Sequence, residues 1–424
     1  MIMHKLKSML GKNDFSSNLL KLSYFSGGNL IARFFMLGNA ILVARALGPN
    51  LLGIYSGLYA FLSVLITFVN FGQDLWFLKE AHNYSLLEYL AGKIILIKLI
   101  LGLIIGALSL IILPITHPKV FAPSLILLAI GDVVSENTIL TIYTYWNIRR
   151  HIKLINFMLF LSNIGRITLL LLLINTNHVS PLTIVGSRFI VSFTVLFISI
   201  TIMKPIIVIN KINEYFAILK KSTAYGVSNI LAMIYAKIDV VILSFYSINN
   251  TGFYSPASGI VQTLFVIPNS IFTFLLPKYS ESISNQKKIP SEKTLKRIIY
   301  IFIIIGSILS ITLYLIGPYV IELILGKSYY ATSELLKILS PILFFKSISF
   351  GAALLIIITG NQRKRLIPQF IVTLFNIILN IILIPYFGLT AIGWIYTASE
   401  FLLMLGYILI IIKIFSKENR IQST

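Results

Sequence analysis

The stretch AYGVSNILAMIYAKIDVVILSF (224–245) places two charges, Lys237 and Asp239, inside 22 otherwise apolar or weakly polar residues. A helix needs about 20 predominantly apolar residues to cross the hydrocarbon of a bilayer. The stretch is therefore long enough to span a membrane. A charge near the middle of such a span is costly unless it meets water or a partner. The two charged residues thus predict a polar interior inside a membrane protein.

The composition of the whole chain points to the same class. Hydrophobic residues make up 57% of the 424 positions, charged residues only 12%, and the mean hydropathy is +0.91. Soluble domains carry about 25% charged residues. We therefore predict an all-α integral membrane protein. Cysteine is absent and the five histidines are scattered, so we expect no disulfide and no metal site. The predicted outer loops are short, so we expect no catalytic residues.

Apolar runs of the required length predict twelve transmembrane helices. They cover residues 23–44, 55–72, 94–115, 121–146, 155–174, 181–203, 223–246, 254–276, 298–321, 335–359, 366–384 and 390–412. Pro256 and Pro268 predict a kink in the eighth helix, because a proline inside a helix removes a backbone hydrogen bond. The segment GLIIG (102–106) has the small-residue spacing that lets membrane helices pack closely.

The loops between these helices carry a strongly uneven distribution of charge. Of the 35 basic residues seven lie within the predicted helices, and 25 of the remaining 28 fall on one side. Basic loops stay in the cytoplasm, so both termini are predicted to be cytoplasmic. We expect these loops to serve topology and contact with anionic lipid, and not nucleic-acid binding.

Two segments of the chain align without a gap at a shift of 199 residues. KLSYFSGGNL…GPNLLGIY (21–55) lies over KKSTAYGVSN…INNTGFY (220–254), which matches Gly53 with Gly252 and Tyr55 with Tyr254. Six predicted helices separate the two copies, so both halves point the same way. This predicts two parallel-repeat bundles of six helices, residues 1–210 and 211–424, around a central cavity.

The stretch ARALGPNLLGIYS (44–56), with its counterpart GFYSPASG (252–259), resembles the polysaccharide-biosynthesis and O-antigen (Wzx-type) flippases. These belong to the multidrug/oligosaccharidyl-lipid/polysaccharide exporter superfamily. The resemblance implies twelve helices, inward termini and transport of a lipid-linked sugar. The second half lacks the Ala-Arg and Leu-Gly-Pro elements of the first, so only Arg45 can take the role that this arginine has in the family.

Charged residues within the predicted helices are the candidate functional residues. Two basic ones have simple structural explanations: Lys98 can reach the inner membrane surface, and Lys337 can pair with Glu334 on the same helix face. The other five are predicted to bind substrate. They are Arg33, Arg166, Arg188, Lys237 and Lys346. Each would cost at least ~2.5–3.5 kcal/mol if it faced lipid at the bilayer centre.

Four acidic residues lie within the same helices, namely Asp132, Glu136, Asp239 and Glu400. They are predicted to serve as counter-charges or to bind a coupling ion, H⁺ or Na⁺. If they pair with the basic residues, those pairs are structural instead. Asp239 and Lys237 lie about 200° apart on a helix, so they do not pair with each other. Arg45 and Asp74 are candidate gate residues. We expect no other cofactor.

Seven basic residues against four acidic ones give a positive interior, which suits an anionic cargo. The sequence therefore predicts a flippase that moves a polyprenyl-diphosphate-linked oligosaccharide from the inner to the outer leaflet by alternating access. Fixed cations offset the high cost of burying a phosphate. We expect the protein to lie in the inner membrane of a prokaryote and to have no enzymatic activity. A polysaccharide polymerase and glycosyltransferases are its candidate partners. A multidrug exporter and a membrane polymerase or glycosyltransferase remain alternatives.

Overall fold

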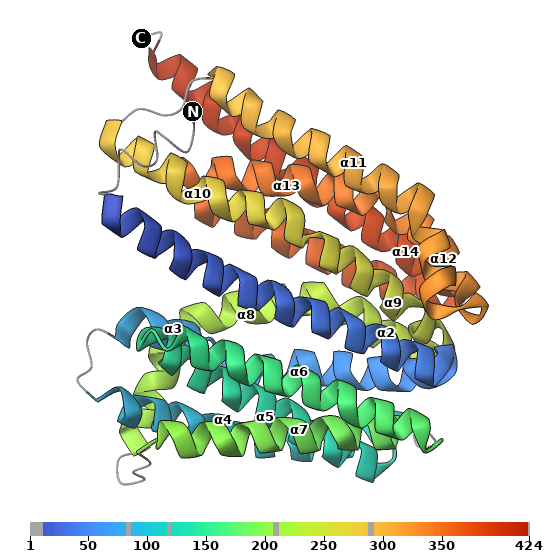
Figure 1. The fold of residues 1–424 in the computed structure, drawn as a ribbon. Coiled ribbons are helices and arrows are strands. Elements are labelled where there is room, and N and C mark those ends of the chain that lie inside the picture. The colour runs from blue at the N-terminus through green and yellow to red at the C-terminus, as the bar shows by residue number, and fades with distance from the viewer. Residues whose placement is uncertain (1–11, 82–85, 117–119, 207–211, 287–291, 423–424) are drawn as a thin grey trace. The chain divides into compact units, whose positions relative to one another are not determined.

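The computed structural model describes residues 12–81, 86–116, 120–206, 212–286 and 292–422 and, within these ranges, contains helices and no strand (Figure 1). The helices are α2 (Lys12–Asn70), α3 (Gln73–Glu80), α4 (Leu87–Thr116), α5 (Pro123–Ile148), α6 (Ile152–Asn175), α7 (Pro181–Met203), α8 (Ile212–Tyr246), α9 (Ile248–Leu264), α10 (Val266–Gln286), α11 (Glu292–Leu325), α12 (Tyr330–Leu339), α13 (Pro341–Ile358) and α14 (Leu366–Gln422). Short 3₁₀ turns precede α12 and α14.

Ten segments within the described ranges are long and apolar enough to cross a membrane, which confirms a multi-pass membrane protein. Two of them, Phe35–Glu80 and Gln362–Ile414, are about twice the length that one crossing needs. Each contains a glycine with non-helical dihedral angles, Gly48 (φ 66°) and Gly388 (φ 53°). The structure thus holds ten to twelve apolar helices. The count of twelve, the twofold arrangement and the cytoplasmic termini stay predictions.

The break in α14 turns this helix back on itself. Gln369 donates to the Tyr407 hydroxyl at 2.7 Å, and Asn376 donates to Ser399 at 3.1 Å. In each pair, one residue precedes Gly388 and the other follows it at nearly the same distance along the sequence. This pattern is that of two antiparallel helices joined by a turn. Only glycine adopts a positive φ here without steric cost. The sequence predicted two helices in this region, 366–384 and 390–412, and the turn falls between them.

The predicted kink of the eighth helix is confirmed. α9 ends at Leu264 and α10 begins at Val266, two residues before Pro268, whereas Pro256 lies inside α9. Pro268 has no N–H to donate to the carbonyl of Leu264, four residues earlier, so the helical ladder is interrupted there. The predicted tenth helix begins later than expected, at Pro341, and α12 precedes it as a separate helix.

Contacts divide the described chain into two units. The first contains residues up to Ala46 together with Leu65–Ile230, and the second contains Leu47–Val64 together with Leu231 onward. Helices α3 to α7 belong to the first unit and α9 to α14 to the second, while α2 and α8 contribute to both. The division of the sequence at residue 210 stays a prediction.

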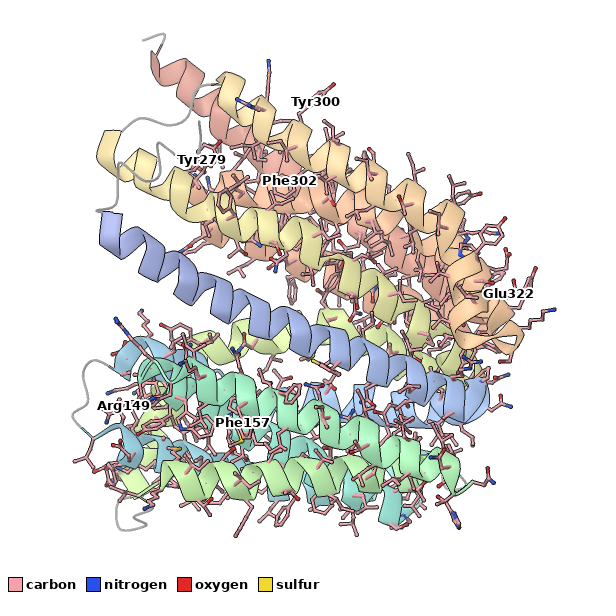
Figure 2. All side chains as sticks on the ribbon, viewed as in Figure 1. Arg149, Phe157, Tyr279, Tyr300, Phe302 and Glu322 are labelled. Carbon is pink, nitrogen blue, oxygen red and sulfur yellow. The ribbon has the colours of Figure 1, made fainter. Side chains whose placement is uncertain are left out.

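Each unit has its own apolar core. Trp76, Phe77 and Trp146 are buried in the first unit, where α3, α4 and α5 meet. In the second, Phe302 is fully buried and Tyr279 packs against the same cluster (Figure 2). Large apolar side chains such as Phe157 point outward, as expected for helices that face lipid.

Small residues set the closest helix contacts in the first unit. A Cβ added to Gly102 or Gly106 of α4 would lie 2.9 or 3.0 Å from the side chains of Val134 and Ile130 on α5. The GLIIG segment is therefore a packing surface, as its spacing predicted. In lipid, burial of apolar surface provides no net free energy for helix association. Helices therefore associate through such close packing.

Residues matched by the 199-residue shift meet in the second unit. Ser255 donates to Ser56 at 2.9 Å, and these two residues are also 199 positions apart, directly after the aligned segments. A Cβ on Gly53 would lie 1.9 Å from the carbonyl oxygen of Ile248, and one on Gly252 would lie 1.7 Å from that of Pro49. Pro49 and Ile248 are also 199 residues apart. The two helices thus cross at a point where each presents a glycine to the backbone of the other.

Candidate functional site

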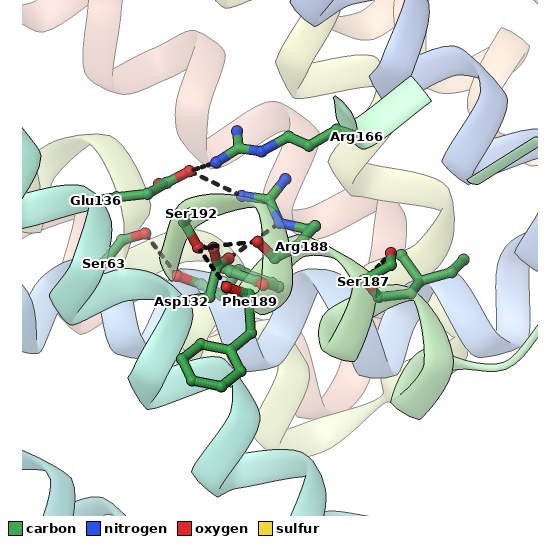
Figure 3. Close-up of polar contacts among 10 residues, drawn as sticks. Ser63, Asp132, Glu136, Arg166, Ser187, Arg188, Phe189 and Ser192 are labelled. Carbon is green, nitrogen blue, oxygen red and sulfur yellow. Dashed lines mark hydrogen bonds and ion pairs between the residues drawn. The ribbon is translucent and has the colours of Figure 1, made fainter. Parts of the chain in front are cut away.

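The first unit contains a cluster of charges built by α5, α6 and α7 (Figure 3). Arg188 donates through Nε to Asp132 at 3.0 Å and through a terminal nitrogen to Glu136 at 3.4 Å. Arg166 donates to the same oxygen of Glu136. Ser192 donates to the other oxygen of Asp132 at 2.5 Å. We call these five residues the arginine cluster.

Helical spacing explains why the arginine cluster forms. Asp132 and Glu136 are four residues apart on α5, and Arg188 and Ser192 are four apart on α7, so each pair lies on one helix face. α5 and α7 pack along each other, which brings the two faces together. Two guanidinium groups and two carboxylates give the cluster no net formal charge. The pairing that the sequence left open as an alternative is therefore observed for Arg166 and Arg188.

The second unit contains a smaller ion pair. Lys346 of α13 donates to Oε1 of Glu400 on α14 at 2.8 Å, and Tyr235 of α8 donates to the same oxygen at 2.9 Å. Glu400 is fully buried, and its second oxygen has no hydrogen-bond partner among the described residues. The ammonium group of Lys346 also lies over the rings of Tyr235 and Phe265, 5.4 and 5.5 Å from their centroids.

The two charges of α8 have different surroundings. Asp239 is buried and accepts a hydrogen bond from Tyr254 of α9 and one from the backbone N–H of Val240 at 2.7 Å. Lys237 is half-buried, and no carboxylate in the described part of the chain forms an ion pair with it. Asp239 therefore finds the partner on another element that its position predicted. Lys237 does not.

The prediction that Lys98 reaches the membrane surface is wrong. Its side chain is fully buried and donates to Asp74 at 2.7 Å and to the carbonyl oxygen of Asn137 at 2.8 Å. Asp74 also accepts from Thr141 at 2.8 Å and from Asn70 at 3.1 Å. Acceptors on α3 and α5 thus replace water at the ammonium group. Asp74, the candidate gate residue, lies within this hydrogen-bond network.

The remaining candidates lie elsewhere. Lys337 pairs with Glu334 at 2.8 Å as predicted, and this hydrogen bond raises the pKa of Lys337. It lies on α12, outside the apolar segments, and not within a transmembrane helix as expected. Arg45 is exposed. The side chain of Arg33 lies outside the residues that the structure describes.

Sequence reasoning did not find the hydroxyl groups that complete these networks. Ser192, Tyr235 and Tyr254 each donate to a carboxylate that the sequence had singled out. The four-residue spacing of Ser192 from Arg188 is a usable signal, because both share one helix face. For the tyrosines, their partners lie on other helices, and no local spacing points to them.

The chain matches the model of the family described as "Polysaccharide biosynthesis protein" over residues 19–283. The chain belongs to this family. A segment of 168 residues is 26% identical to the capsular polysaccharide biosynthesis protein CapF of Staphylococcus aureus. That segment covers 40% of this chain and 42% of CapF, well under half of either protein.

Solved structures with the same fold are membrane transporters. The lipid II flippase MurJ in an inward closed conformation superimposes with a TM-score of 0.72 at 18% identity, covering 91% of this chain and 87% of MurJ. An inward-facing multidrug resistance MATE transporter of the MOP superfamily gives 0.67 at 16% identity, covering 94% of this chain and 99% of that one. At identities of 18% and 16%, this similarity shows that the chain has the same fold as these two proteins.

Proposed function

We propose that this protein flips a polyprenyl-diphosphate-linked oligosaccharide, a repeat unit of O-antigen, capsule or exopolysaccharide, from the inner to the outer leaflet. The membership in a polysaccharide biosynthesis family supports the class of cargo. The transporter fold supports movement across a membrane. A headgroup that carries a diphosphate needs fixed cations on its path, since an unpaired anion in hydrocarbon costs tens of kcal/mol.

The single observation that carries the cargo assignment is the state of Lys237. It is a cation in the middle of an apolar helix without an ion-pair partner in the described chain. A structural ammonium at this depth would be paired, as Lys98 and Lys346 are. Among the described cations deep in the apolar segments, Lys237 is therefore the one without a carboxylate partner, and it can offer its charge to a phosphate. Arg166, Arg188 and Lys346 would contribute as paired cations, and Arg33 as a further one.

The transport cycle that we propose is alternating access of the predicted bundles, with Arg45 and Asp74 as gate residues. Coupling to H⁺ or Na⁺ would involve the buried carboxylates. Glu400 is the strongest candidate, because one of its oxygens is buried without a partner in the described chain. Asp239, Asp132 and Glu136 are the others. The proposed setting is the inner membrane of a prokaryote, beside a polymerase and glycosyltransferases.

Deletion of the gene followed by lipid extraction tests this function. Build-up of polyprenyl-linked repeat units on the inner leaflet is the expected result. Unpolymerised units that accumulate outside would instead favour a polysaccharide polymerase, and unchanged glycan with a lost resistance to cationic drugs would favour a multidrug exporter. A multidrug exporter of cations would need surplus acid in its interior, whereas the apolar segments here carry more base than acid.

Substitution of Lys237 tests the cargo contact. Lys237→Ala is expected to reduce export by at least about tenfold, the effect of losing roughly 1.4 kcal/mol of binding. Lys237→Arg keeps the charge and is expected to retain most of it. Lys337→Ala removes an exposed ammonium outside the apolar segments and is the matched control. Wild-type export from Lys237→Ala at normal protein level would reject this contact.

A further inference from the structure

The two carboxylates of the arginine cluster are held very differently. Asp132 is fully buried and accepts hydrogen bonds from both Ser192 and Arg188. The side chain of Glu136 is 38% exposed and receives both guanidinium groups on the single oxygen Oε1. Asp132 is therefore a fixed part of the fold. Glu136 is the member of the cluster that can leave with little loss of burial.

Arg166 has donors that the described chain does not use. Its side chain is only 12% exposed, its ion-pair partner is Glu136, and its Nε is buried without a hydrogen-bond partner. A guanidinium offers five N–H donors in a planar fork that matches the oxygens of a carboxylate or a phosphate in pairs. One shared carboxylate oxygen satisfies this fork incompletely. A group with more oxygens would satisfy it better.

Arg188 stays in place when Glu136 leaves. Its Nε–H is bound to Asp132 at 3.0 Å, which fixes the direction of the guanidinium plane. The contact of its terminal nitrogen with Glu136 is longer, 3.4 Å. The guanidinium groups of Arg188 and Arg166 thus meet at Oε1 of Glu136, and that of Arg188 is oriented by a buried residue.

The position of Glu136 shows what it faces. It lies at the middle of α5, an apolar helix that is long enough to cross a membrane. An ionised side chain at that depth that is exposed to acyl chains would be strongly unfavourable. Its exposed part therefore faces water or another polar group, and an ion that travels through such a polar region can reach Arg166 and Arg188.

We propose that Arg166 and Arg188 form a diphosphate-binding site, and that Glu136 is an internal anion that occupies this site until the diphosphate of the cargo displaces it. The idea rests on the proposed function and deepens it. Exchange of one anion for another keeps both guanidinium groups paired throughout the cycle. It thereby avoids the cost of an unpaired buried guanidinium at Arg166 in the empty protein. Return of Glu136 helps to release the cargo on the far side.

Binding of undecaprenyl diphosphate to the purified full-length protein in nanodiscs tests the exchange. Glu136→Gln keeps the shape of the side chain but removes the competing charge, so it should tighten binding by about fivefold or more, a typical coupling between two ligands. Adding Arg166→Gln to this variant should abolish the gain. Glu334→Gln removes a carboxylate from another ion pair and should bind like the wild type. Unchanged or weaker binding by a folded Glu136→Gln variant would overturn the proposal.

A second measurement uses the unmodified protein, in case Glu136→Gln does not fold. Phenylglyoxal modifies accessible arginines, and mass spectrometry identifies which ones react. Undecaprenyl diphosphate should protect Arg166, whereas undecaprenol, which lacks the diphosphate, should not. Equal modification of Arg166 in both samples rejects the site. If the wild type binds undecaprenyl diphosphate but Glu136 and Arg166 have no influence, the site and the exchange fail, whereas the proposed function stands. If the wild type does not bind it and gene deletion leaves export unchanged, the proposed function fails as well.

Discussion

Lys98 and Asp74 form an ion pair whose ammonium group is fully buried. The ammonium group has no exposed surface, and hydrogen bonds from Thr141 and Asn70 complete the shell of the carboxylate. Removing one partner of such a pair leaves an uncompensated buried charge and costs about 3–5 kcal/mol. Lys98→Met is therefore expected to lower the thermal unfolding temperature strongly, as measured by fluorescence-detected size-exclusion chromatography after heating.

The double variant Lys98→Met with Asp74→Asn is the control for this pair. It removes both charges, so it should be more stable than either single variant. If Lys98→Met alone unfolds at the wild-type temperature, the pair does not contribute to stability. The charges of Lys98 and Asp74 were visible in the sequence, but their pairing was not. They lie on different helices 24 residues apart, and no helical spacing connects them.

At the scale of elements, the crossing of the α2 segment 49–64 with α9 depends on two glycines. A Cβ at Gly252 would lie 1.7 Å from the carbonyl oxygen of Pro49, and this backbone atom cannot move aside alone. Gly252→Ala is expected to destabilise the protein by about 1–3 kcal/mol, the usual cost of overpacking. Heating followed by measurement of the folded fraction gives the shift.

Gly259 on the same helix is the matched control, because a Cβ there would meet nothing within 4 Å. Gly259→Ala should be neutral or stabilising by up to about 1 kcal/mol, since alanine is the better helix former. Equal effects of the two substitutions would show that the crossing tolerates a methyl group. The repeat pattern aligned Gly53 with Gly252 from sequence alone. It did not reveal that the two glycines meet, because alignment gives equivalence and not distance.

At the scale of the whole molecule, hydropathy and composition predicted the membrane class and the helices. They do so because the cost of exposing backbone and charge to lipid constrains every span in the same way. The cationic interior was harder to predict. Counting seven basic against four acidic residues treats each charge as independent, whereas Arg166, Arg188 and Lys346 prove to have carboxylate partners on neighbouring helices. Charge balance within spans depends on which helices pack together.

The hairpin in α14 makes a prediction about topology that a chain without cysteine can test directly. If α14 turns back at Gly388, then Gln362 and Lys413 lie on one side of the membrane and Tyr386, which is 79% exposed, lies near the other. The basic residues beside Gln362 predict that the first side is the cytoplasm. Single cysteines at these three positions should therefore react differently with a membrane-impermeant maleimide. Tyr386→Cys should be labelled in intact cells, and Gln362→Cys and Lys413→Cys only after permeabilisation. Labelling of Gln362→Cys and Lys413→Cys from opposite sides would mean that α14 crosses an odd number of times, and the hairpin at Gly388 would then be rejected.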